Sequence, residues 1–127
     1  MIVVSLQVEA LLPGCTSLKE KRMVLHSLTD RLRSRTELAV AEVDFQDKLQ
    51  HTLLGMACVS GSAAHAQRML DLAWECILNE DRLLVVEVRD YTCLLYTSQN
   101  LRIRKRILDP VQRYRTKRRE LDQSQNN

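Results

Sequence analysis

The chain begins with a pattern of alternating apolar and polar residues. Every second residue from Ile2 to Ala10 is apolar, while Gln7 and Glu9 lie at positions between them. A period of two is typical of a strand with one buried face, so we predict a strand over residues 2–12. A proline and a glycine directly after it favour a turn at that end.

A helical period follows the first strand. Four leucines from Leu18 to Leu32 recur at helical spacing, which predicts an amphipathic helix that ends near Arg35. Ser17 and Glu20 stand three residues apart at its start. This is the spacing of a capping box, in which both side chains accept hydrogen bonds from free amides at the helix start.

The rest of the apolar pattern predicts three more strands and a second helix. The strands are expected over 38–43, 53–60 and 83–88, the first two joined by a polar hairpin. The second helix begins after Ser62 and ends near Asn79, because apolar residues there repeat every three or four positions. The order βαββαβ predicts an α+β ferredoxin-like sandwich, a four-stranded antiparallel sheet with both helices on one face.

The core is expected where the apolar faces of these elements coincide. The sheet presents one face to both helices, so the inward residues of all elements form one cluster. The side chains expected to be buried together are Leu6, Val8, Leu25, Leu28, Leu32, Met56, Cys58, Leu70, Trp74, Val86 and Val88.

Charge divides the chain into two parts. Residues 1–91 carry 10 Lys and Arg against 13 Asp and Glu, whereas residues 92–127 carry 9 against 3. A reversal of this kind is typical of a folded body with a basic appendage. We therefore predict a domain over 1–91 and a basic C-terminal arm over 92–127, disordered or forming at best two short helices. One of these would start at Asp109-Pro110. The positive charge of the arm either gives non-specific affinity for RNA or has no function.

Composition and motifs exclude several classes of protein. No run approaches the ~20 apolar residues of a membrane span, and the start of the chain lacks the basic region of a signal peptide. We therefore expect a cytoplasmic protein with no membrane partner. There is no glycine-rich phosphate loop and the four cysteines are not spaced as zinc ligands, so we expect no cofactor, no small-molecule substrate and no enzyme.

Three carboxylates provide the alternative to a non-catalytic protein. Glu42 and Asp44 are expected on one strand face, with Asp47 close behind. Carboxylates at such spacing can hold a magnesium ion or share a proton. A metal-dependent enzyme is therefore kept as an alternative, although a solvated hairpin explains the same residues.

The polar face of the first helix is rich in cations. Its candidate nucleic-acid-binding residues are Lys19, Lys21, Arg22, Arg31 and Arg35. The open face of the predicted sheet is a poorer platform for RNA, because it lacks stacking aromatic residues. It is also expected to carry Glu9, Glu42 and Glu87, which repel phosphate. The helix is therefore the better electrostatic candidate.

Three strings in the sequence resemble a bacterial family. They are Ser17-Leu-Lys-Glu-Lys-Arg22, then Ala41-Glu-Val-Asp44-x-Gln46-Asp47, then Leu54-Gly-x-Ala-Cys-Val-Ser60. In this order and spacing they resemble the YlxP-like proteins of unknown function, over residues 1–91 only. The resemblance implies a ferredoxin-like α/β sandwich. It also implies an RNA- or ribosome-associated role, because the genes of the family commonly lie beside genes for transcription-elongation, translation-initiation and ribosome-maturation factors.

Residues and resemblance together predict a non-catalytic binding module that associates with RNA or a ribosomal particle. The first alternative is a protein-interaction module, a homodimer formed through the open sheet face or a strand edge, without nucleic acid. Salt-dependent RNA binding would favour the first function, because each neutralised phosphate adds to the salt dependence. A dimer that is insensitive to salt and does not bind RNA would favour the second.

Overall fold

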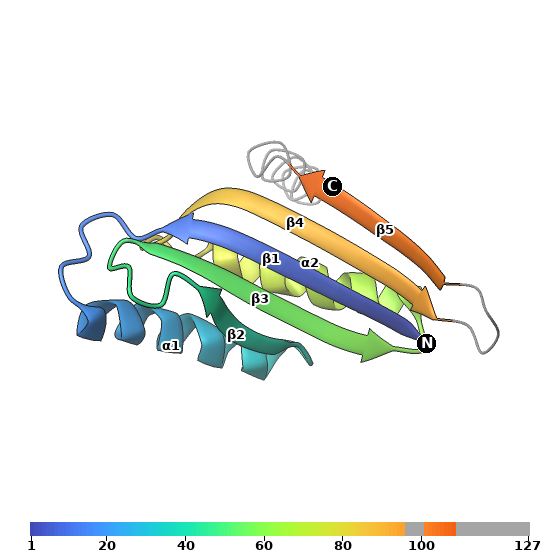
Figure 1. The fold of residues 1–127 in the computed structure, drawn as a ribbon. Helices are drawn as coiled ribbons and strands as arrows, with labels where there is room; N and C mark the ends of the chain where they lie inside the picture. The colour runs from blue at the N-terminus through green and yellow to red at the C-terminus, as the bar shows by residue number, and fades with distance from the viewer. Residues whose placement is uncertain (96–100, 109–127) are drawn as a thin grey trace, which may run out of the picture.

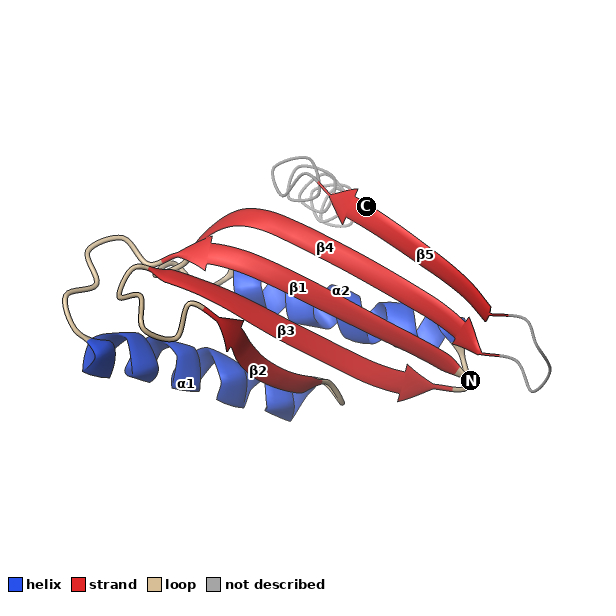
Figure 2. Ribbon diagram, viewed as in Figure 1, coloured by secondary structure: helices blue, strands red, loops and turns tan. Residues whose placement is uncertain are grey.

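The computed structural model describes residues 1–95 and 101–108, which form one sheet and two helices (Figure 1). In chain order the elements are β1 (Ile2–Leu11), α1 (Leu18–Arg35), β2 (Ala39–Asp44), β3 (His51–Ser60), α2 (Ala63–Leu78), β4 (Leu84–Leu95) and β5 (Leu101–Leu108). All strand pairs are antiparallel, in the order β2-β3-β1-β4-β5. Figure 2 shows both helices on the same face of this sheet.

The predicted α+β ferredoxin-like sandwich is confirmed. The first four strands stand in the order β2-β3-β1-β4 and the chain follows βαββαβ. The predicted capping residues also act at the start of α1. Ser17 Oγ accepts from the amide of Glu20 at 3.1 Å, whereas the Glu20 carboxylate accepts from the amide of Thr16 rather than that of Ser17.

Nine of the eleven expected core residues are buried between the sheet and the helices, and Val86 and Cys58 are not. Val86 is 45% exposed because β4 carries a bulge beside it. Glu9 pairs with Glu87 but the next residue of β1 pairs with Val85, so Val86 has no partner in the ladder. The extra residue reverses the alternation, and Val85 packs against the core instead. Cys58 is partly buried at the margin of the core.

The structure differs from the expected basic arm. β4 continues past residue 91 to Leu95, and residues 101–108 form a strand, β5, paired along β4 from Val88 to Leu95. The physical reason is that β4 without β5 would leave a row of unpaired backbone groups, which accepts any extended segment. The helix expected to start at Asp109 lies outside the described residues. The division of the chain at residue 91 stays a prediction.

Candidate functional site: the groove between α1 and β2

A buried lysine connects the start of α1 to β2. Lys21 lies at helical spacing from Leu25, Leu28 and Leu32, so it points at the sheet and is only 2% exposed. Its Nζ donates to the backbone carbonyl of Phe45 at 2.6 Å and lies 3.0 Å from Glu42 Oε2. A buried ammonium group needs such partners, because its desolvation is costly when it is unpaired.

Two neighbours complete this polar network. Thr52 on β3 donates its hydroxyl hydrogen to the Glu42 carboxylate, so that carboxylate contacts both α1 and β3. Phe45, whose carbonyl accepts from Lys21, has a φ of 62° in the left-handed region, which costs free energy for a residue other than glycine. The network therefore fixes the turn after β2 as well as the position of α1.

The ring of Phe45 is held from the other side of the turn. It stacks on the imidazole of His51, with ring centroids 3.8 Å apart and an interplanar angle of 14°. His51 Nε2 lies 2.7 Å from Glu9 Oε1 on β1. These contacts order the hairpin from the open face of the sheet, while Lys21 orders it from the helix face.

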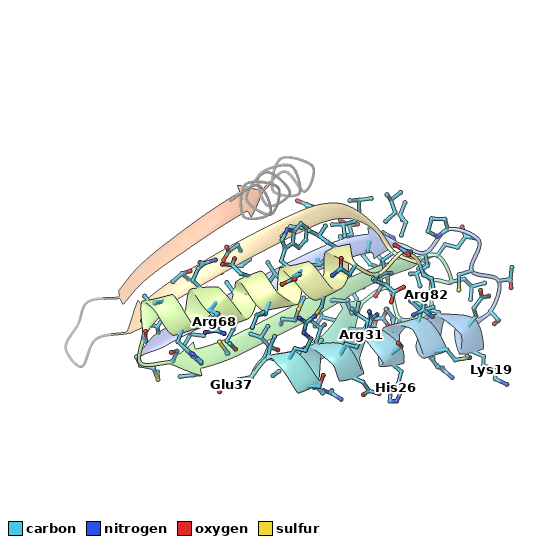
Figure 3. The ribbon with its side chains drawn as sticks, turned by 180° about the vertical axis from the view of Figure 1, so that it is seen from behind. Lys19, His26, Arg31, Glu37, Arg68 and Arg82 are labelled. Carbon is cyan, nitrogen blue, oxygen red and sulfur yellow. The ribbon has the colours of Figure 1, made fainter. Side chains whose placement is uncertain are left out.

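A groove of about 920 Å³ runs between the outer surface of α1 and β2. Its α1 side carries the cations Lys19, Arg22 and Arg33 beside Met23, which is 63% exposed. Figure 3 shows Lys19 and His26 projecting from the side of α1 that faces away from α2. Lys19 and Arg22 form no ion pair with any residue that the structure describes.

The five predicted nucleic-acid-binding residues fall into three places. Only Lys19 and Arg22 line the groove. Lys21 is inside the protein, so the prediction that it contacts phosphate is corrected: its position in the leucine stripe of α1 turns it inward. Arg31 pairs with Glu80, and Arg35 Nη1 donates to Cys76 Sγ at 3.7 Å, so both are directed toward α2 and the loop that follows it.

The three carboxylates of the predicted metal site are not brought together. The pairing of β2 with β3 shifts between Glu42 and Asp44, which places a bulge at Val43. Glu42 turns toward α1, whereas Asp44 lines a hollow of about 280 Å³ on the open face with Glu9 and Glu87. The expectation that Glu42 lies on the open face is therefore wrong. Within residues 1–95 and 101–108, no group of three or more His, Cys, Asp or Glu is placed to hold a metal ion.

Glu80 forms a separate clamp between the helices and β4. It is 5% exposed and accepts from Arg82 Nε at 2.7 Å and from Arg31. Hydrogen bonding to Arg82, assisted by Arg31, lowers the pKa of Glu80 from 4.5 to about 2, against the opposing effect of burial. The charged carboxylate is thus the form that the fold requires.

The sequence contains a signal for the direction of Lys21, but none for the residues that line the groove. The leucine spacing of α1 continues back to Lys21, so its inward direction was readable from the helical period. The exposed side chains of Met23 and Arg33 alternate with buried ones on the same helix, but nothing in the sequence says that β2 passes beside them. Only the tertiary arrangement of α1 and β2 creates the groove.

Two of the three strings that suggested a family resemblance contribute residues to this groove, and the third lies in the neighbouring strand β3. The first begins α1 and contains Ser17 and Lys21, and the second covers the end of β2 with Glu42. The third lies in β3 and contains Gly55, where a Cβ would approach Val43 Cγ1 to 3.0 Å. The strings therefore encode a helix cap, a buried ion pair and the close approach of β2 to β3.

Comparisons with known proteins agree with that resemblance. Residues 3–90 match a family described as a protein of unknown function, DUF503. The chain is also similar to the uncharacterized protein YlxP of Bacillus subtilis (strain 168), with 34% identity over 62 residues. The aligned region is 49% of this chain and 67% of that protein. In the described part of the chain, no helix has the length and apolar character needed to cross a membrane.

Proposed function

The chain belongs to the DUF503 family, whose function is unknown, and we propose that it is a non-catalytic binding module whose anionic partner occupies the groove between α1 and β2. One observation carries this proposal: the groove is open, and Lys19 and Arg22 line it without carboxylate partners among the described residues. Glu42, the acidic residue at the groove, is already paired with Lys21. The groove therefore attracts negative charge.

RNA, alone or in a ribosomal particle, is the first candidate partner. A cytoplasmic location is part of the same proposal. Lys19, Arg22 and Arg33 lie along one side of α1, where they can contact different phosphates of one RNA strand. The open sheet face is less suitable, because Glu9 and Glu87 lie there beside Asp44. If RNA binds in the groove, loss of each cation lowers the salt dependence of binding by roughly 0.7–0.9 in the logarithmic slope.

A protein partner is the second candidate, and a different observation favours it. β2 stands at the end of the sheet, and among the described residues it is paired with β3 alone. Its other edge borders the groove, and exposed strand edges accept further strands. A homodimer through this edge is one form of this candidate.

Retention on immobilised heparin, a sulfated polyanion, tests the groove without assuming either partner. The full chain with Lys19→Ala and Arg22→Ala is compared with a control of equal net charge, Lys48→Ala and Arg68→Ala. The two control residues are exposed, lie away from the groove and form no ion pair in the described part of the chain. Residues 92–127 are present in both proteins, so their positive charge cancels.

We expect the groove variant to elute at a clearly lower salt concentration than the control. Equal elution of the two variants would contradict the proposal, because it would mean that only net charge matters. Circular dichroism melting of both variants shows whether either change has altered the fold.

A further inference from the structure

Of the two candidate partners of the groove, we propose the second, and specifically an extended acidic segment of another protein, which adds a strand to the outer edge of β2. This inference rests on the proposed function, since it names the class of partner for the same groove. It needs three properties of the groove: a hydrogen-bonding edge, room beside that edge, and positive charge opposite it.

The edge is supplied by Val40 and Glu42. Arg33 Nη2 donates to the Val40 carbonyl and Gln46 Nε2 donates to the Glu42 carbonyl, each at 3.4 Å. Both carbonyls are therefore directed away from β3. In an antiparallel strand the amide and carbonyl of one residue point to the same side, so the amides of Val40 and Glu42 also face outward. These two residues present the hydrogen-bonding pattern of a ladder, and the side chains of Arg33 and Gln46 contact its acceptors at the long distance of 3.4 Å.

The room beside the edge is the groove itself. Its volume is about 920 Å³ and Val40, Ala41 and Glu42 border it on the β2 side, so it can take an incoming backbone about 4.8 Å away. Met23 stands across the groove from β2 and is exposed. Its flexible thioether can pack on varied apolar side chains of a docked strand.

The charge selects an acidic segment. Side chains of a docked strand alternate between the α1 side and the open side of the sheet. Those on the α1 side meet Lys19, Arg22 and Arg33, while Asp30, an acidic residue of the same helix, lies 3.3 Å from His26. Acidic residues at every second position of the segment therefore complement the groove.

The same charges disfavour a second copy of this chain. Pairing of β2 with β2 about a two-fold axis would place both α1 helices on the same face of the joined sheet, with their cationic sides toward each other. Lys19, Arg22 and Arg33 would then meet the same residues of the other copy, and like charges in close contact weaken association. RNA satisfies the cations but cannot pair with the amides of Val40 and Glu42 as a strand does.

Amide hydrogen exchange by NMR separates these occupants. The probe is a short peptide of alternating valine and glutamate, added to the full chain. We expect the amides of Val40 and Glu42 to exchange more slowly when the peptide is bound, while those of Ala39 and Ala41, already paired with β3, change little. A peptide with lysine in place of glutamate, or with every amide N-methylated, should not bind.

Binding of the same valine–glutamate peptide, labelled with a fluorophore, is then measured for the groove variant and for its control. This gives an independent readout. Lys19→Ala with Arg22→Ala should weaken binding by about fivefold, given the strength of exposed ion pairs, and Lys48→Ala with Arg68→Ala should leave it within about twofold of wild type by the same reasoning. Val40 and Glu42 are unchanged in both variants, so the edge itself is kept.

Three outcomes would overturn the inference. The first is binding of RNA in the groove with no binding of the acidic peptide. The second is protection of Val40 and Glu42 that grows with protein concentration alone, which would identify a second copy as the occupant. The third is peptide binding that leaves both amides unprotected. If the heparin test succeeds while the peptide fails, the binding groove stands and only the protein segment is wrong; if both fail, the proposed function fails as well.

Discussion

The two helices lie on the same face of the sheet, but they are held there by different interactions. All the buried residues of α2 are apolar, from Ala66 to Ile77. α1 buries four apolar residues and also Lys21, which bonds to β2 and to the turn after it. The helix that carries the candidate binding surface is therefore the one whose position depends on specific polar contacts.

The largest expected effect tests what the helices share. Leu28 on α1 and Leu70 on α2 are both fully buried, so Leu28→Ala and Leu70→Ala should each lower the free energy of unfolding by ~2–5 kcal/mol through lost burial and cavity formation. Urea unfolding measures both losses. A loss below about 1 kcal/mol at Leu28, far under that range, would mean that α1 packs much more loosely than α2.

The next effect tests what distinguishes α1. Lys21→Met leaves the partly buried Glu42 carboxylate without its partner, so we expect a loss of about 2–4 kcal/mol, somewhat less than for a fully buried pair. Adding Glu42→Gln should recover at least half of that loss, because no unpaired charge is left. Leu25→Met is the matched control on the same face of α1 and should cost less than about 1.5 kcal/mol. If Lys21→Met is no worse than this control, the polar network does not hold α1.

A smaller effect depends on pH and on the clamp between the helices. The pKa of Glu80 is about 2 in the folded protein, below its ordinary value of 4.5, because Arg82 and Arg31 donate to the charged form. The stability that this carboxylate contributes is therefore full above pH 4.5 and is lost as the pH falls from there toward 2. We expect about 1–2 kcal/mol over this range, after allowing for solvent screening of the half-exposed arginines. Urea unfolding at pH 6 and pH 3 should show that Glu80→Gln reduces this pH dependence.

The smallest effect compares the helix caps. Ser17 Oγ accepts from the amide of Glu20 on α1, and Ser62 Oγ accepts from the amide of His65 on α2. Ser17→Ala and Ser62→Ala should each cost about 1 kcal/mol. In α1 the Glu20 carboxylate also accepts from Thr16, so Glu20→Ala should destabilise it further by a few tenths of a kcal/mol. The cap of α1 is therefore expected to be the stronger of the two. A far larger loss of stability for Ser62→Ala than for Ser17→Ala would contradict this ranking.

The fold was largely predictable because its signals are local. The alternation from Ile2 to Ala10 and the leucine spacing of α1 each specify an element and its buried face. The two positions where alternation misled are bulges, at Val86 and Val43. A bulge is determined by pairing with a neighbouring strand, so the strand's own residues do not predict it. Strand β5 carries no clear local signal, because charged residues interrupt its apolar positions and its partner, β4, is not identified by the segment's own residues.

The candidate site was less predictable, because it depends on which side of α1 each cation occupies. The cations of the helix provide five candidates, but their side chains point to three different places: the groove, the core and the surface of α2. For Lys21 the helical period indicates that the side chain points inward. For Arg31 the partner is Glu80, which lies 49 positions away in the sequence. No reading of α1 alone identifies a partner at that distance along the chain.

The burial of Lys21 makes this amine a natural reporter of how often the protein opens. Acylating reagents modify amines that solvent reaches, so Lys19 and Lys48, both exposed, should react quickly with acetic anhydride. Lys21 can react only while α1 separates from β2 and the turn beyond it. Its slow acetylation, followed residue by residue by mass spectrometry, would therefore measure the free energy of that local separation without any label being introduced.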